Sequence, residues 1–109
     1  MRTVVIESPY AGDIATNLRY LRAAMRDCLR RGEAPFASHA LYTQDGVLDD
    51  AVPGERRLGI DAGFAVGARL DAVVFYLDLG WSPGMEAALR YWLVEGRVIE
   101  ERFLPGWTG

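Results

Sequence analysis

Glu86 is the acidic residue whose sequence neighbours point most directly to chemistry. It follows Ser82-Pro83-Gly84, in which Ser82 can cap a helix, Pro83 fits the first helical position and Gly84 leaves room for a ligand at the backbone. A helix N-terminus favours an ionised carboxylate, and its free amides can bind a phosphate or sugar oxygen. Glu86 therefore has two interpretations, a carboxylate that acts on a ligand or a glutamate that only caps its helix.

Asp61 and Asp78 are two further acids that can take part in a reaction. On a helical wheel Asp61 falls beside Phe64 and two alanines, and a carboxyl in apolar surroundings has a raised pKa and can act as a general acid. An equally good interpretation places Asp61 at the rim of its helix, in water. Asp78 directly follows an apolar segment. An ionised carboxylate beside a protonatable one fits a displacement at the anomeric carbon of a sugar, and in a nucleoside the leaving group is the base.

His39, Tyr10 and Trp81 can complete such a site. His39 can supply a hydrogen bond or a proton, although a lone histidine is more often structural. Tyr10 and Trp81 can stack on a nucleobase or simply pack within their loops. These residues suggest a nucleoside or nucleotide as the small-molecule ligand.

The composition excludes several other chemistries. The chain of 109 residues has a net charge of −3 and no lysine, so a P-loop and Schiff-base chemistry are both excluded. A single histidine and a single cysteine, Cys28, exclude a zinc cluster and a disulfide, and we expect no metal and no cofactor. The acidic balance argues against nucleic-acid binding. No apolar run is long enough for a membrane span, and we predict a cytoplasmic protein.

Apolar segments alternate with turn signals and predict four strands and three helices in one domain, residues 1–109. Strands are expected over 3–6, 34–38, 72–77 and 98–103, and helices over 13–31, 53–69 and 82–96. This alternation is typical of a parallel sheet covered by helices, and ligands bind such sheets beyond the carboxyl ends of the strands. The last helix is apolar on two sides, which predicts a homodimer or a higher homo-oligomer.

Three segments resemble the nucleoside 2-deoxyribosyltransferase-like superfamily, and most closely its short bacterial and phage members. They are VIESPYAG at 5–12, ASHALYTQ at 37–44 and GWSPGME at 80–86. The resemblance implies a small flavodoxin-like (Rossmann-like) α/β sandwich of three layers, with a parallel sheet of about four to five strands. It also implies a hydrolase or transferase that cleaves the N-glycosidic bond of a 2′-deoxynucleoside or its 5′-monophosphate.

The resemblance also implies roles for single residues. The family's nucleophile, the Glu of a Gly-x-Glu motif, falls on Glu86, and Asp61 or Asp78 is then the acid. Gly80 stands where the family often has an Asp, and Val5 where active members often have a Tyr. Three functions stay open: an N-glycosidic enzyme, a non-catalytic nucleotide-binding protein and a dimer that acts only through protein contacts. The expected ligand contacts are Ser8, Pro9, Tyr10, Gly12, His39, Trp81, Ser82 and Gly84.

Overall fold

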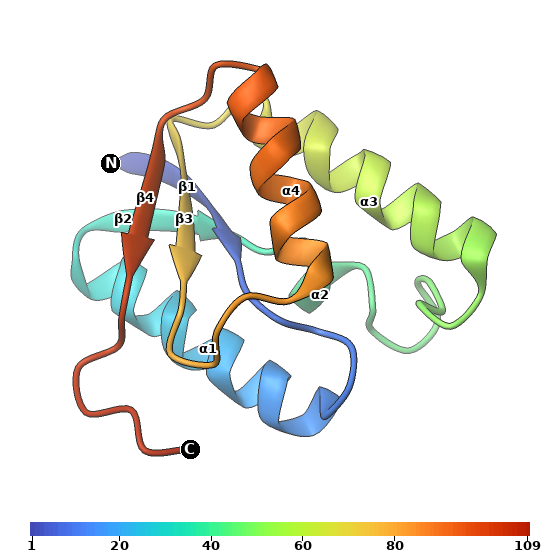
Figure 1. The fold of residues 1–109 in the computed structure, drawn as a ribbon, viewed down its shortest axis with the longest axis horizontal. Coiled ribbons are helices and arrows are strands. Elements are labelled where there is room, and N and C mark those ends of the chain that lie inside the picture. Colours follow the sequence, from blue (N-terminus) through green and yellow to red (C-terminus); the bar gives the residue numbers. More distant parts are fainter.

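Four short parallel strands form one sheet in the order β2-β1-β3-β4 in the computed structural model, which describes residues 1–109 (Figure 1). The strands are β1 (Arg2–Glu7), β2 (Glu33–Phe36), β3 (Ala72–Tyr76) and β4 (Ile99–Arg102). Because β1 and β3 each lie between two neighbours and are covered on both faces, they are rich in apolar residues, and every residue of β3 is buried.

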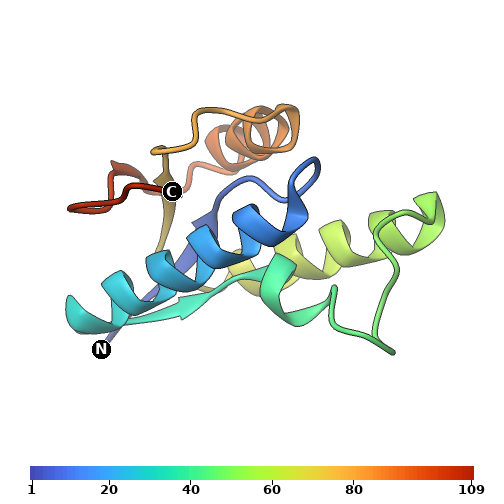
Figure 2. The ribbon, with the colours of Figure 1, turned by 90° about the horizontal axis from the view of Figure 1, so that it is seen from below.

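Helices cover both faces of this sheet. α1 (Ile14–Arg30) packs on one face, and α3 (Pro53–Gly67) and α4 (Pro83–Val94) pack on the other; Figure 2 separates α1 from α4. The predicted flavodoxin-like α/β fold is confirmed, with four strands in the sheet. None of the helices combines the length and the apolar character that a membrane span requires.

Two helix starts follow the capping signals of the sequence. The Asp13 carboxylate accepts a hydrogen bond from the Thr16 amide at 3.2 Å and caps α1, and the Ser82 hydroxyl accepts one from the Met85 amide at 3.2 Å and caps α4. The predicted boundaries agree with the observed ones to within two residues, but one short helix was not predicted. The strand expected over 34–38 ends at Phe36, and the four-residue helix α2 (Ser38–Leu41) begins one residue later, after Ala37. A helix of one turn has no periodic apolar pattern, so the sequence did not reveal α2.

The core consists of two apolar clusters, one on each face of the sheet. On the α1 face Cys28 is fully buried, as expected for a core residue, and its sulfur lies 3.4 Å from the Tyr76 hydroxyl. Burial raises the pKa of the Cys28 thiol, which makes it a poor nucleophile. On the α3/α4 face Trp92 is the largest fully buried side chain. The buried residues around it are Val5, Val73, Phe75, Leu77, Met85 and Ala88.

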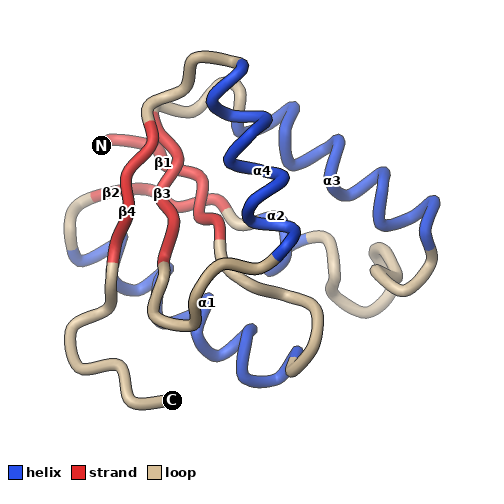
Figure 3. The backbone as a smooth tube through the Cα atoms, viewed as in Figure 1, coloured by secondary structure: helices blue, strands red, loops and turns tan.

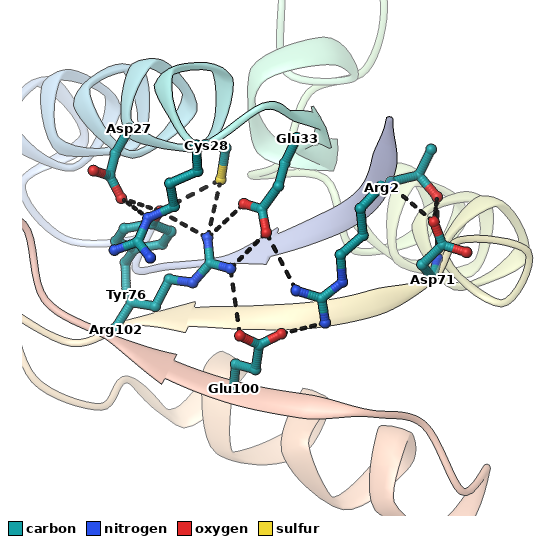
Figure 4. A network of polar contacts seen from close by, with 10 residues as sticks. Arg2, Asp27, Cys28, Glu33, Asp71, Tyr76, Glu100 and Arg102 are labelled. Carbon is teal, nitrogen blue, oxygen red and sulfur yellow. Dashed lines mark hydrogen bonds and ion pairs between the residues drawn. The ribbon is translucent and has the colours of Figure 1, made fainter.

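A buried ion pair joins the two edge strands across the α1 face (Figure 4). Both terminal nitrogens of Arg102 donate to the two carboxylate oxygens of Glu33, each at 2.7 Å. Arg2 also donates to Glu33 and to Glu100, and Arg102 contacts the Tyr76 hydroxyl at 3.3 Å. These contacts satisfy two charges that would otherwise be unpaired beneath α1.

The carboxyl ends of β1, β2 and β3 lie at one edge of the sheet, as parallel pairing requires. The chain continues from this edge into the loop over 8–13, into α2 and the long loop over 42–52, and into the loop over 77–82 (Figure 3). Gly12 and Gly80 have φ values of 98° and 80°, a backbone conformation that favours glycine. This edge is where a ligand site is expected.

Candidate functional site

A cavity of about 540 Å³ lies at the carboxyl end of β1, on the face of the sheet that α3 and α4 cover. Its size is typical of small-molecule sites. The end of β1, the start of α2, the middle of α3 and the first three turns of α4 all contribute to its walls. The polar or charged residues that line it are Glu7, Ser8, Ser38, His39, Asp50, Arg56, Arg57 and Ser82.

Aromatic rings form two walls of this cavity. The rings of Tyr10 and His39 are stacked, with centroids 4.8 Å apart and planes at 14°. The rings of Phe64 and Tyr91 are stacked at 3.8 Å, and Trp92 meets Phe64 edge-on at 5.1 Å. Burial lowers the pKa of His39, so this ring is neutral at pH 7 and can stack or accept a hydrogen bond. Such walls fit a planar ligand.

Glu7 is an acid of this cavity that the sequence interpretation missed. Its carboxylate accepts a hydrogen bond from the indole nitrogen of Trp92 at 2.7 Å. Burial raises the pKa of Glu7 to about 7, although the Trp92 bond acts in the opposite direction. A signal for it was available, because a glutamate that ends an apolar strand stands at the edge where ligands bind parallel sheets.

Polar groups without protein partners lie along the same cavity. Ser8 is buried and its hydroxyl has no hydrogen-bond partner, which is uncommon for a buried polar group. Arg56 lines the cavity and is exposed, and it forms no ion pair, whereas Arg57 pairs with Asp61 at 3.0 Å. Arg56 is therefore a free cation at the cavity, suited to a phosphate.

The structure does not bring the three expected acids together at the cavity. Glu86 is exposed on α4, while Met85, Ala87 and Ala88 line the cavity. The Asp61 side chain is 53% exposed and pairs with Arg57. This position matches the interpretation that placed Asp61 at the rim of its helix, in water. Asp78 accepts hydrogen bonds from the Tyr20 hydroxyl and from the Leu104 amide in the loop after β3.

Five of the eight expected ligand contacts line the cavity, and three do not. Gly12 instead lines a second, more open cavity of about 810 Å³ beneath the loop over 43–51. Trp81 packs on Phe75, with ring centroids 5.1 Å apart, and Pro9 is buried within the loop over 8–13. The five that line the cavity are Ser8, Tyr10, His39, Ser82 and Gly84.

Fold and site together define a small parallel α/β protein with an aromatic-walled ligand cavity at the carboxyl edge of its sheet. Residues 2–102 match the family described as "Domain of unknown function (DUF7768)", and the chain belongs to this family. A search of the curated proteins found no matching sequence. Among solved structures, the fold is similar to that of a 2-deoxyribosyltransferase from the psychrotolerant bacterium Bacillus psychrosaccharolyticus. The TM-score is 0.72 and the identity 13%, over 98% of this chain and 76% of that one.

Proposed function

We propose that this protein binds a nucleoside or a nucleoside 5′-monophosphate in the 540 Å³ cavity. The observation that supports this most directly is the combination of aromatic walls with an unpaired arginine around one cavity. A planar base fits against the Tyr10–His39 and Phe64–Tyr91 pairs. The Arg56 guanidinium can pair with a phosphate, while the Gly84 amide in the first turn of α4 can donate to a sugar or phosphate oxygen.

The reaction we infer for this site is cleavage of the N-glycosidic bond of a 2′-deoxynucleoside or its 5′-monophosphate, with the sugar passed to water or to a second base. A carboxylate attacks C1′, the electron pair of the C1′–N bond leaves with the base, and an acid protonates that base. The resemblance of the sequence to the nucleoside 2-deoxyribosyltransferase-like superfamily implies that Glu86 attacks and that Asp61 or Asp78 supplies the proton. The shared fold with a 2-deoxyribosyltransferase supports this class of reaction.

Release of free base from a panel of 2′-deoxynucleosides and their 5′-monophosphates tests this reaction. We expect release by the native protein and a loss of about 100-fold or more in Glu86→Ala, as for removal of a covalent nucleophile. Glu95→Ala is the matched control, because Glu95 is an exposed acid at the other end of the same helix. No release by the native protein would overturn the reaction. Equal release by Glu86→Ala would overturn the role of Glu86.

Binding without catalysis is the second candidate function, and the positions of Glu86, Asp61 and Asp78 outside the cavity favour it. Nucleotides should then raise the melting temperature equally in the native protein and in Glu86→Ala. Arg56→Ala should remove the preference for monophosphates over nucleosides, because it removes the arginine at the cavity that has no carboxylate partner. If no nucleoside or nucleotide stabilises the fold, both candidate functions fail.

A further inference from the structure

The hydrogen bond between Trp92 and Glu7 determines how the Glu7 carboxyl can act. An indole N–H can only donate, so the oxygen that it contacts, Oε2, must accept. The other oxygen, Oε1, makes no hydrogen bond within the protein. When the carboxyl is neutral, Oε2 is therefore its carbonyl oxygen and Oε1 holds the proton. That proton has no acceptor in the protein.

The surroundings of Glu7 indicate which part of a nucleoside lies beside it. Val5, Phe64, Met85 and Ala88 line the same cavity, and Trp92 beside Glu7 is fully buried. A sugar in such apolar surroundings would leave several hydroxyls unpaired, whereas a planar base needs few hydrogen bonds and gains from ring contacts. The unpartnered Ser8 hydroxyl lies next along the chain and offers one further polar contact.

We propose that Glu7 is the base-recognition residue of the cavity, and that its Oε1–H donates a hydrogen bond to an unprotonated ring nitrogen of the bound nucleobase. This proposal rests on the proposed function and specifies it further, since it assigns the base to the end of β1 and leaves the phosphate to Arg56. A base that presents an acceptor nitrogen to Glu7 is preferred over one that presents a C–H group there.

Ligand binding should consequently depend on pH. An ionised Glu7 cannot donate, and its charge repels the lone pair of a ring nitrogen. With the pKa of Glu7 at about 7, the neutral fraction of the carboxyl falls by roughly 20-fold between about pH 6.5 and pH 8.5. Only burial and the Trp92 hydrogen bond shift the pKa of Glu7. The other titratable or charged groups that line the cavity are Tyr10, His39, Asp50, Arg56, Arg57 and Tyr91.

Calorimetric titration with carbocyclic 2′-deoxyadenosine tests the proposal. This probe is uncharged over the pH range and lacks a glycosidic bond, so it is not cleaved. For the native protein we expect the affinity to fall by roughly 20-fold from about pH 6.5 to pH 8.5. Glu7→Gln should bind equally at both pH values, because Trp92 orients the amide oxygen and leaves the amide N–H as a donor that does not titrate. Asp50→Asn, which removes the other carboxyl at this cavity, should keep the pH dependence.

Analogues that replace one ring nitrogen by C–H test the contact itself. Among the 1-deaza, 3-deaza and 7-deaza forms of the probe, one should bind the native protein at least about tenfold more weakly than the probe at about pH 7, as expected for one lost hydrogen bond to a buried group. Equal binding of all four compounds, or a native affinity that does not change with pH, overturns the proposal. If no nucleoside or nucleotide binds at all, the proposed function fails as well.

A measurement without ligand checks the geometry in the native protein alone. The NMR signal of the Trp92 indole N–H should shift with a midpoint near pH 7, because its acceptor gains or loses a charge there. A signal that is flat from about pH 5 to pH 9 overturns the assignment of a titrating carboxyl to this cavity.

Discussion

Glu7 combines a ligand-facing position with a cost in stability. Because its pKa rises from 4.5 to about 7 on folding, the folded chain holds a proton between these values that the unfolded chain releases. The contribution of this group to stability is complete below about pH 4.5 and is lost as the pH rises through about 7. A buried carboxylate that lowers stability at neutral pH is typical of a residue kept for function.

Glu7→Gln should therefore stabilise the protein more at high pH than at low pH. The difference in free energy of unfolding between variant and native protein should increase by about 1 to 3 kcal/mol from about pH 4.5 to pH 8. Urea denaturation at both pH values measures it. His39, whose pKa is lowered, contributes in the opposite sense below about pH 6.5, but it does so in both proteins and cancels in the difference. A difference that stays constant would show that Glu7 does not titrate near 7.

At the scale of elements, Gly67 sets how closely α3 approaches the sheet and α4. A Cβ atom at this position would lie 2.6 Å from Trp92 Cη2 and 2.8 Å from Val5 Cγ2, both in the core. Gly67→Ala should destabilise the protein by about 1 to 3 kcal/mol, since overpacking outweighs the gain in helix propensity. Gly54→Ala, in the first turn of the same helix and with open space around it, should be neutral or slightly stabilising. Thermal or urea denaturation of the two variants checks this. A Gly67→Ala protein as stable as Gly54→Ala would mean that α3 can move away.

The capping residues and the burial of β3 were predictable because each depends on local chemistry. Asp13 and Ser82 begin helices through their own side chains, and an apolar run such as 72–77 must be covered on both faces. The direction of Glu86 was not predictable in the same way. α4 is apolar on two sides, so a helical wheel of its sequence does not show which side faces the cavity. The packing of α3 beside α4 determines that side.

The location of the ligand site was predictable, but its chemistry only in part. Ser8, His39 and Ser82 stand at the carboxyl ends of strands and do line the cavity. The raised pKa of Glu7 comes from its burial in the packed fold, and its hydrogen-bond partner Trp92 is 85 residues away in the sequence. A contact between two residues so far apart in the sequence forms only in the packed fold, and the local sequence pattern does not indicate it.

At the scale of the whole molecule, the Glu33–Arg102 pair should be essential to stability. The pKa of Glu33 is lowered chiefly by its hydrogen bonds from Arg102. Removing one partner in Arg102→Met should cost about 3 to 5 kcal/mol, because it leaves the buried Glu33 carboxylate without its main partner. The double variant Arg102→Met/Glu33→Leu should recover most of that loss, and urea denaturation compares the two. Asp61→Ala, which breaks the exposed pair with Arg57, should change stability by less than about 0.5 kcal/mol.

The expected homodimer stays a prediction, and α4 offers a surface for it. Leu93 and Val94, near the C-terminal end of this helix, are 59% and 86% exposed, and neither lines the cavity. An aspartate at Val94 should separate such a dimer into monomers, since burying an unpaired charge in the interface is unfavourable. Sedimentation of the native protein and of Val94→Asp decides the matter, and a native protein that is already monomeric contradicts the prediction.

The ion pair between the edge strands also affects the order in which the chain becomes stable. Glu33 and Arg102 are 69 residues apart, in strands at opposite edges of the sheet. A partly formed sheet that has β1, β2 and β3 but lacks β4 buries the Glu33 carboxylate beneath α1 without Arg102. The unpaired buried charge destabilises such an intermediate, so the stability of the first three strands depends on the presence of β4. Unfolding of this small sheet should therefore be cooperative, without strands that separate one at a time.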